Sequence, residues 1–396
     1  MEVDTAVVLA AGEGTRLRPL TQNRPKPMLP AGNRPILEHV FDALVDAGVE
    51  RLVTVIGYKR DRVQDYFGPT YRGVPITYVT QHKQLGSGHA LLQARSVVDG
   101  PMIVVNGDRL IDAPTVEAVA DMFSKTDGPT ISVVEHQDVS QYGAVELHDG
   151  VISDLIEKPR EDDYRLINGG VYAFSAEIFD LIEETPRQAG ELALTDTLAD
   201  YIEHAQIYGV EVGGLWVDAT YPWDLLTVAQ EVLTRGRLET NLQCDQVWTA
   251  DSAQIHAEAV LQGPVAVGPD CEIGPQAVIG PDTVLGANVT VGANTVIQRS
   301  VLDADTRVNS GSTLLDTVTG QDVHISSGSI VPSGPADVQV GSTVFEDQQL
   351  GAVIADRVDI GSSVTIIPGS LIGPNATLTD GLTVRGNVSA RTEVTH

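Results

Sequence analysis

The chain has 396 residues, a formal net charge of −29 and a hydrophobic fraction of 42%. That length exceeds what one ordinary core supports, so we expect two domains. The acidic residues are spread along the chain, which argues against a nucleic acid as partner. No run of about 18 apolar residues offers a membrane span, and Cys244 and Cys271 are too few for a disulfide framework, so we expect a cytoplasmic protein.

Acidic residues are abundant while lysines are few, five in all. This pairing is similar to the composition of proteins from high-salt cytoplasms, where screening weakens self-repulsion. We therefore expect a halophilic protein. The first ten residues, "MEVDTAVVLA", predict a strand rather than a signal peptide.

The first half alternates strand and helix patterns. Strands are predicted at 5–10, 51–57, 76–79 and 101–108, and helices at 35–48, 60–68 and 88–98. Such a βαβ series predicts an α/β, Rossmann-like domain with a mostly parallel sheet. Ligands of such sheets bind at the carboxyl ends of the strands, where the loop after residue 10 and the turn at 106–108 both fall.

The loop after the first strand concentrates positive charge. Five of the 25 basic residues stand between positions 16 and 34, in an otherwise acidic chain. Backbone N–H groups beside Gly12 and Gly14 can approach phosphates closely because no Cβ intervenes. Together these features predict an anion site in this loop.

A dinucleotide-binding fingerprint does not explain this loop. Leu17 stands where the third glycine is needed for helix packing, and a proline-rich basic segment replaces the phosphate-binding helix. A P-loop is excluded because no Gly-Lys-Ser/Thr follows.

From Leu261 onward the pattern changes to a six-residue repeat. Aliphatic residues recur at every sixth position from Leu261 to Ile297, and a second register runs from Ile354 to Leu378. This period predicts a parallel β-helix, whose coils must stack on one another to bury their apolar positions. The domain boundaries expected are 1–223 for the first domain, 224–244 for a connecting helix and linker, and 245–396 for the β-helix.

Several motifs of the first half resemble those of the sugar-1-phosphate nucleotidyltransferases. They are "LAAGEGTRLRPLTQNRPKPMLP", "QLGSGHAL", "VVNGD", "YGAVEL", "EKP", "NGGVYAF", "GELALTD" and "WVDATYPWDLL". The resemblance covers about residues 4 to 230 and includes the thymidylyltransferases and the two-domain uridyltransferases with a left-handed β-helix. It implies transfer of a nucleotidyl group from UTP or dTTP to a sugar 1-phosphate, with release of pyrophosphate.

The resemblance also implies roles for individual residues. Arg16, Lys26 and Asp108 are expected to be catalytic, and Asp108 and Asp218 to hold Mg²⁺ through their carboxylate oxygens. The expected nucleotide-binding residues are Leu9, Ala11, Gly12, Gly14, Thr15, Gln81, Gly86 and Ser87. The expected sugar-phosphate-binding residues are Gly143, Glu157, Lys158, Asn168 and Val171. Arg109, directly after Asp108, departs from the family pattern.

The reaction needs no nucleophilic side chain. The second pKa of a phosphate monoester lies near ~6, so the attacking oxygen is largely ionised at neutral pH. Alignment and charge stabilisation are then sufficient, and no general base is assigned.

The β-helix leaves two functions open. In the two-domain uridyltransferases it acetylates glucosamine 1-phosphate with acetyl-CoA, and residues 307–373 resemble that region. However, Ser310 stands where the family has its catalytic His, and a neutral Ser cannot accept the amine proton as imidazole does. A scaffold or oligomerisation role is the preferred interpretation, with a trimer favoured by resemblance, and a non-catalytic sugar-nucleotide sensor is a third hypothesis.

Overall fold

The computed structural model describes residues 3–137, 139–157, 159, 164–238 and 240–396. The chain divides into two compact units. The first contains residues 1–13, 25–28 and 36–217, and the second contains residues 14–24, 29–35 and 218–396. Each unit is described by itself below.

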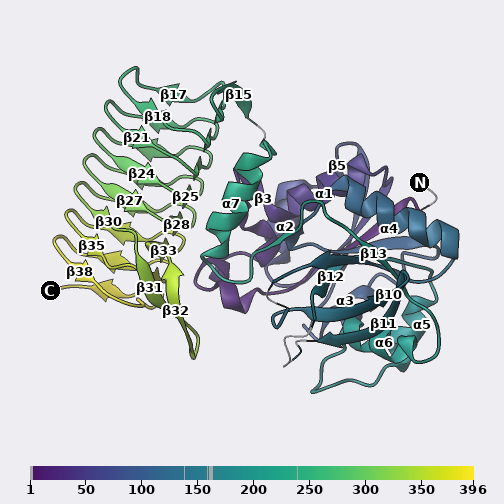
Figure 1. The fold of residues 1–396 in the computed structure, drawn as a ribbon. Coiled ribbons are helices and arrows are strands. Elements are labelled where there is room, and N and C mark those ends of the chain that lie inside the picture. The colour runs from purple at the N-terminus through teal and green to yellow at the C-terminus, as the bar shows by residue number, and fades with distance from the viewer. Residues whose placement is uncertain (1–2, 138, 158, 160–163, 239) are drawn as a thin grey trace. The chain divides into compact units, whose positions relative to one another are not determined.

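The first unit is built on one ten-stranded sheet (Figure 1). Its strands, in spatial order, are β10 (Gly143–His148), β11 (Val151–Glu157), β13 (Tyr208–Glu211), β9 (Thr130–Glu135), β12 (Leu166–Phe174), β7 (Met102–Asn106), β1 (Thr5–Ala10), β4 (Arg51–Ile56), β6 (Val74–Thr80) and β5 (Thr70–Tyr71).

The expected mostly parallel sheet is parallel only in part. Strands β7, β1, β4 and β6 are parallel, but β12 lies antiparallel between β7 and β9, and β10 and β11 are also antiparallel. The sheet is therefore mixed. The βαβ pattern predicted the parallel strands because each is followed by a helix, whereas β10 and β11 are joined by a two-residue turn that forces antiparallel pairing.

Helices cover both faces of this sheet. One face packs against α1 (Ile36–Asp46), α2 (Arg60–Phe67) and α4 (Ala113–Thr126), and the other against α3 (Ser87–Leu92), α5 (Ile178–Glu184) and α6 (Leu194–Ile202). Strand β1 is apolar at every position after Thr5 because alternate residues enter the two cores. Ala6 and Val8 join one core and Val7 joins the other. Helix α3 ends earlier than predicted and continues as turns with i→i+3 hydrogen bonds.

Asp112 begins helix α4 and ties it to a distant segment. Its Oδ1 accepts hydrogen bonds from the backbone N and Oγ1 of Thr115, and its Oδ2 accepts one from the backbone N of Leu215. The side chain is buried, and a Cβ on Gly214 would lie 2.4 Å from Oδ2. This carboxylate therefore satisfies donors from two segments that water cannot reach.

An Asp112→Ala variant is expected to unfold more readily, by ~2–3 kcal/mol, because the helix cap and a buried hydrogen bond are lost together. Thermal unfolding of the full chain checks this. Asp121→Ala, an exposed change on the same helix, is the control and should leave the midpoint unchanged. Equal midpoints for the two variants would contradict the assigned role of Asp112.

The second unit contains three sheets of short strands, which we call sheets I, II and III (Figure 1). Sheet I holds β15 (Asn241–Cys244), β16 (Val247–Thr249), β19 (Val265–Val267), β22 (Thr283–Leu285), β25 (Val301–Leu302), β28 (Thr317–Thr319), β33 (Ala352–Ile354) and β36 (Ser370–Ile372). Sheet II holds β17 (Gln254–Ile255), β20 (Glu272–Ile273), β23 (Thr290–Val291), β26 (Arg307–Val308), β29 (His324–Ile325), β34 (Asp359–Ile360), β37 (Thr377–Leu378) and β39 (Glu393–Val394). Sheet III holds β18 (Val260–Leu261), β21 (Val278–Ile279), β24 (Val296–Gln298), β27 (Thr313–Leu315), β30 (Ile330–Val331), β35 (Thr365–Ile366) and β38 (Thr383–Val384).

From β16 onward, successive strands visit the three sheets in turn, and each pairs in parallel with the next strand of its own sheet. This arrangement is consistent with a β-helix, and we call residues 247–394 the coil stack. The repeated aliphatic residues form its core, since Val267, Ile273, Ile279, Leu285, Val291 and Ile297 are at most 3% exposed. The six-residue period thus predicted these buried positions correctly, whereas Leu261, the first residue of the series, is only partly buried.

The two registers of the repeat are separated by shorter coils. Val267 pairs with Leu285, but Leu285 pairs with Leu302, one residue sooner. The following coils keep this shorter step until a hairpin, β31 (Pro335–Val340) and β32 (Thr343–Gln349), is inserted between β30 and β33. The period is interrupted in the sequence although the stack continues in space.

The corners of the coil stack use left-handed backbone. Residues with positive φ recur at the turns, and Asp and Asn are the commonest among them. They include Asp270, Asp282, Asn288, Asn294, Asp305, Asp316, Asp322 and Asn375. Short polar side chains tolerate this conformation because they bond locally to the backbone.

Helix α7 (Asp224–Thr234) lies in the predicted connecting segment and packs against strands β22, β25 and β28 of sheet I. The hairpin also contacts the segment before this helix. The rings of Tyr221 and Trp223 lie 4.4 and 5.3 Å from that of Phe345. In the described part of the chain, no helix is long and apolar enough to cross a membrane.

Candidate active site

Two of the three predicted catalytic residues meet at one edge of the first unit. Strands β1 and β7 are parallel neighbours, so both end at the same edge, and the backbone N of Gly107 donates to Leu9 O. Asp108 follows β7 there, and Lys26 Nζ lies 2.8 Å from its Oδ2. The lysine side chain is 11% exposed and the aspartate side chain 33%. This pair places a cation and an oxygen ligand where α/β sheets bind phosphates.

Leu9 and Ala11 lie at the end of strand β1, and Gly12 follows them. Gly12 is exposed, and a Cβ built on it meets no atom within 4 Å, so the protein itself does not require glycine here. The open space leaves room for a phosphate against the backbone. Gln84 Nε2 donates to Ala11 O at 3.1 Å and so fixes the end of the strand.

The rest of the basic loop belongs to the second unit. Gly14 has φ +69° and precedes a short 3₁₀ helix, Thr15–Leu17. Thr21 Oγ1 donates to Gly14 O at 2.8 Å and closes the loop. Thr15 and Arg16 are exposed.

Asp218 also belongs to the second unit, at the end of strand β14 (Val217–Asp218). Its Oδ2 accepts a hydrogen bond from Thr220 Oγ1 at 3.2 Å. The placement of Arg16 and Asp218 relative to Lys26 and Asp108 stays a prediction. Within the described residues, no group of three or more His, Cys, Asp or Glu could hold a metal ion.

Gln81 is buried and its amide is held in one orientation. Nε2 donates to Gly86 O at 3.1 Å and lies 2.9 Å from His89 Nδ1. Burial, together with Arg187, lowers the pKa of His89, which favours the neutral ring that accepts this hydrogen bond. Because both amide hydrogens are used, Gln81 can offer a ligand only its carbonyl oxygen.

Gly86 and Ser87 pack the segment after Gln81 against residues 192–194. Gly86 has φ +100°, and a Cβ there would lie 2.4 Å from Leu192 O. Ser87 Oγ accepts from the backbone N of Leu194 at 2.9 Å. The contact of Ser87 with Leu194 is therefore structural, while the role of Ser87 toward the nucleotide stays a prediction.

Three predicted sugar-site residues lie together beside the antiparallel strands. A Cβ on Gly143 would lie 3.3 Å from Glu157 Oε2 and 3.6 Å from Asn168 Cβ. Asn168 Nδ2 donates to the Tyr172 hydroxyl, and its Oδ1 accepts from the backbone N of Gly170. The amide nitrogen can donate one further hydrogen bond, and the amide oxygen can accept one further hydrogen bond.

Val171 and Lys158 stand apart from this group. Val171 is fully buried in the core, and its backbone N donates to Ser132 Oγ. Its side chain therefore has no route to a sugar. Lys158 lies outside the described residues.

Arg109, which departs from the family pattern, lies beside the sugar-site residues. Its NH1 donates to Asn168 O at 3.1 Å, and its guanidinium carbon lies 5.6 and 5.4 Å from the ring centres of Tyr142 and Trp216. These contacts are cation–π in geometry. Sequence reasoning named Arg109 only as an anomaly, and the aromatic residues of "YGAVEL" and "WVDATYPWDLL" were the signal that a cationic group would have partners there.

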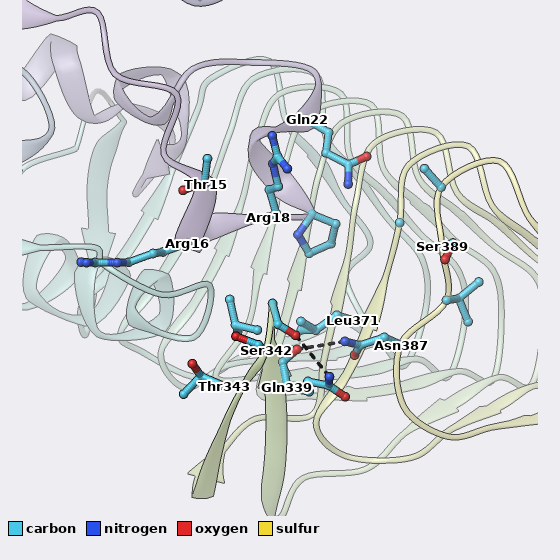
Figure 2. A pocket seen from close by; sticks show the side chains of 16 residues that line it. Thr15, Arg16, Arg18, Gln22, Gln339, Ser342, Thr343, Leu371, Asn387 and Ser389 are labelled. Atoms are coloured by element: carbon cyan, nitrogen blue, oxygen red, sulfur yellow. Dashed lines mark hydrogen bonds between the residues drawn. The ribbon is translucent and has the colours of Figure 1, made fainter. Parts of the chain in front are cut away.

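A pocket of about 490 Å³ lies within the second unit (Figure 2). It is lined by the loop at Thr15 to Gln22, the hairpin tip at Gln339 to Thr343, and coil residues near Leu371 and Asn387. Asn387 Nδ2 donates to Gln339 O at 2.9 Å. In Figure 2 the Arg16 side chain extends away from Gln339 and Asn387, so it does not point into the middle of this pocket.

The imidazole of His324 lies on the coil stack beside Asn309, the neighbour of Ser310, where the family has its acetyl-transfer His. His324 Nδ1 lies 3.2 Å from Asp359 Oδ1, and its Nε2 lies 3.3 Å from Asn309 Nδ2. All three residues are on sheet II or its turn, and the His and Asp side chains are 47% and 63% exposed. Ser310 is exposed as well.

Comparison with known proteins gives the class. A family model described as "Nucleotidyl transferase" matches residues 5–235, and one described as "GMPPB C-terminal domain" matches residues 261–366. The chain is 33% identical over 396 residues to the "Bifunctional protein GlmU" of Methanococcus vannielii, covering 94% of this chain and 92% of that one. It is 38% identical over 224 residues to the "UTP--glucose-1-phosphate uridylyltransferase AglF" of Haloferax volcanii, covering 55% of this chain and 92% of the relative.

Solved structures agree on the fold. A UDP-glucose pyrophosphorylase complexed with UDP-glucose has a TM-score of 0.54 and 24% identity, and covers 59% of this chain and 99% of that one. A UTP-bound UGPase from Acinetobacter baumannii has a TM-score of 0.54 and 23% identity, covering 59% and 94%. The chain is thus a nucleotidyl transferase by class. More particularly, it belongs to the sugar-1-phosphate nucleotidyltransferases and is an enzyme of that family.

Proposed function

We propose that this enzyme transfers a nucleotidyl group from UTP or dTTP to a sugar 1-phosphate, giving an NDP-sugar and pyrophosphate. The observation that carries the proposal is the Lys26–Asp108 pair at the shared edge of β1 and β7. An oxygen of the sugar phosphate attacks the α-phosphorus of the nucleotide. The bond from that phosphorus to the bridging oxygen breaks, and pyrophosphate leaves.

The orientation of the Gln81 amide supports uracil or thymine over adenine and cytosine. Uracil and thymine carry an N–H at position 3, which needs an acceptor, and the Gln81 amide can offer only its oxygen. The N1 of adenine is an acceptor at the equivalent edge and would meet an acceptor. We therefore propose UTP or dTTP as the nucleotide, bound by Gln81 and Gly86 at its base and by the backbone from Leu9 to Thr15 at its phosphates.

Mg²⁺ fits the carboxylates of the proposed site. Asp108 and Asp218 offer oxygen ligands, and Mg²⁺ is usually held by one or two carboxylates together with substrate phosphates. When bound, the ion neutralises phosphate charge. Lys26 and Arg16 add positive charge toward the transferring group, and Lys26 is already held close to Asp108.

The sugar 1-phosphate is proposed to bind at Gly143, Glu157 and Asn168, with Lys158 meeting its phosphate and Val171 supporting the strand from the core. Arg109 adds a cation at this position. Burial and the negative charges of Glu157 and Asp200 raise the pKa of Asp196, so a further carboxyl group lies near Glu157. Glucose and N-acetylhexosamines are both compatible with these contacts.

The experiment is a matrix of four NTPs against sugar 1-phosphates, with pyrophosphate release as readout, in molar KCl and with or without Mg²⁺. Release only with UTP or dTTP, a sugar 1-phosphate and Mg²⁺ supports the proposal. Binding of nucleotide without turnover across the whole matrix would instead support the sensor hypothesis.

Acetyl transfer to glucosamine 1-phosphate from acetyl-CoA is the second candidate function. The observation in its favour is that relatives named "Bifunctional protein GlmU" align over 94% of the chain, including the coil stack. The imidazole available is His324, oriented by Asp359. Thiol release from acetyl-CoA that depends on the amine substrate establishes this activity, and equal release without the amine excludes it.

We also propose a homo-oligomer, with a trimer preferred, formed through sheet III. The outward positions of sheet I are largely buried within the unit, and those of sheet II carry polar groups such as Glu272, Arg307 and His324. Sheet III instead presents Val260, Val278 and Val296 in one column, followed by Thr313 and then Ile330. A second copy of this chain would cover this apolar column.

A Val296→Glu/Ile330→Glu variant is expected to lower the mass in solution to that of one chain, because two charges would be buried in the proposed interface. Light scattering after size-exclusion chromatography measures the mass. Thr290→Glu, on sheet II, is the control and should keep the wild-type mass. An unchanged mass in the double variant would exclude this interface.

The remaining proposals concern the domain architecture and the location of the protein in the cell. We propose the domain division 1–223, 224–244 and 245–396, a left-handed hand for the coil stack, and a cytoplasmic location. The resemblance to the two-domain uridyltransferases supports the second of these, and the composition supports the third.

A further inference from the structure

Arg24, in the basic loop, is buried and paired with two carboxylates of the coil stack. It is 4% exposed, its NH1 contacts Asp303 Oδ2, and its NH2 lies 2.7 Å from Asp356 Oδ1. Asp303 directly follows strand β25, and Asp356 follows β33 by one turn residue. Asp303 is 279 residues from Arg24 in the chain and Asp356 is 332. We call these three residues the Arg24 clasp.

The two carboxylates are oriented by the coil stack itself. Asp303 Oδ1 accepts from the backbone N of Ala304 at 2.7 Å, and Asp356 Oδ1 accepts from the backbone N of Gln321 at 3.0 Å. A Cβ on Gly320 would lie 2.2 Å from Asp356 Oδ1, so this turn has space for the carboxylate only because residue 320 is glycine. The coil stack therefore holds both carboxylates in place as hydrogen-bond acceptors for Arg24.

Burial of a guanidinium costs several kcal/mol unless charge and hydrogen bonds offset it. Desolvation alone would lower the pKa of Arg24, but Asp303 and Asp356 outweigh it and raise the pKa, so the group stays charged. Arginine suits this position because its planar fork reaches two acceptors at once. One point contact of a lysine would not fix the loop in the same way.

Arg24 stands in the chain at the point where the loop of the second unit joins the segment that carries Lys26. Residues 14–24 belong to the compact unit of the coil stack, and the chain enters the other unit at Pro25. Lys26, two residues beyond Arg24, is paired with Asp108 in that unit. The backbone between Gly14 and Lys26 has little conformational freedom, because Thr21 Oγ1 donates to Gly14 O and prolines stand at positions 19 and 25.

We propose that the Arg24 clasp is the device by which the coil stack positions the nucleotide loop, so that Arg24, Asp303 and Asp356 are positioning residues for nucleotidyl transfer. This inference rests on the proposed function. It assigns the coil stack a role in the first reaction, independent of any acetyl transfer.

The test uses the full chain with Asp303→Asn/Asp356→Asn. Asparagine keeps an oxygen for Ala304 N and Gln321 N but removes both charges that face Arg24. The matched control is Asp305→Asn/Asp322→Asn, two exposed corner residues of the same coils. The clasp variant is expected to lose ~10²-fold in kcat/KM for the NTP, mainly through KM, while KM for the sugar 1-phosphate stays unchanged. An unchanged KM for the NTP would overturn the proposal.

A third variant separates positioning from stability. Arg24→Met added to the two asparagines removes the uncompensated charge and is expected to restore the thermal midpoint, because a fully neutral replacement of a buried ion group is often tolerated. Its KM for the NTP should remain high. Recovery of both the midpoint and the KM would show that the clasp is only structural.

Limited trypsin digestion tests the clasp without any turnover. Trypsin does not cleave before proline, and of the basic residues in the first fifty, only Arg16 is not followed by proline. Cleavage at Arg16–Leu17, measured against the exposed Arg187–Gln188 bond, is expected to accelerate ~10-fold in the clasp variant and not in the control. Equal cleavage rates in both would overturn the clasp. Accelerated cleavage with no turnover even in the wild type would contradict the proposed function alone.

Discussion

An Asp108→Asn variant is expected to retain its fold and lose ~10³-fold in kcat/KM for nucleotidyl transfer. Asp108 follows a buried strand, and its carboxylate is the oxygen ligand proposed to hold Mg²⁺ beside Lys26. The amide keeps the shape but is a weaker ligand for a hard cation, so the Mg²⁺ concentration for half-maximal rate should rise. Pyrophosphate release across a Mg²⁺ titration measures both effects.

The control for this change is Asp121→Asn, which also removes one carboxylate but from an exposed position on α4. It should behave as the wild type at every Mg²⁺ concentration. Full activity of Asp108→Asn would remove the metal assignment, because the proposed site has no other described carboxylate at the end of β7.

A Lys26→Gln variant is expected to reduce kcat ~10²-fold without raising the Mg²⁺ requirement. Lys26 Nζ is proposed to stabilise charge on the transferring phosphoryl group, so its loss affects the transition state more than metal binding. Because Lys26 also pairs with Asp108, its removal leaves that carboxylate more available to a cation. The Mg²⁺ titration therefore distinguishes the two partners of one ion pair.

Lys125→Gln, on the exposed side of α4, is the matched control for lost positive charge. Single-turnover rates with saturating NTP and sugar 1-phosphate separate chemistry from binding. If Lys26→Gln changed only KM, the lysine would act in ground-state binding and the catalytic assignment would be wrong.

Local pattern predicted the coil stack better than any other part of the fold. The aliphatic positions were correct because each coil repeats the same inward-facing environment. The pattern did not reveal that the coils between Leu285 and the hairpin are one residue shorter, or that the hairpin at Pro335–Gln349 is an insertion. A stack tolerates such changes at its corners while the core positions stay aligned.

The sheet of the first unit was predicted only where connections are local. One α-helix lies between β1 and β4 and another between β4 and β6, so the parallel pairing follows from right-handed crossover connections. Strand β12 lies between β7 and β9 through pairings with distant strands. No periodicity in a single sequence specifies that insertion.

The candidate site also has features that the sequence predicted and features that it could not predict. The Lys26–Asp108 proximity followed from strand ends, which sequence reasoning can locate. The orientation of the Gln81 amide depends on His89 and on the carbonyl of Gly86, and it could not be read from residue types. The partners of Arg24 could not be predicted, since they are about 300 residues away and single-sequence patterns carry no such information.

The left-handed corners of the coil stack have a further consequence for how this protein can adapt to its solvent. Asp and Asn share the ability to occupy such corners, but only Asp carries charge. Exchange of Asn294 or Asn375 for Asp would add a negative charge at a position where the backbone already suits either residue. The surface charge, and with it the solubility at a given salinity, can therefore change through single substitutions at these corners. Such substitutions leave the buried aliphatic residues of the coil stack and the Lys26–Asp108 pair unchanged.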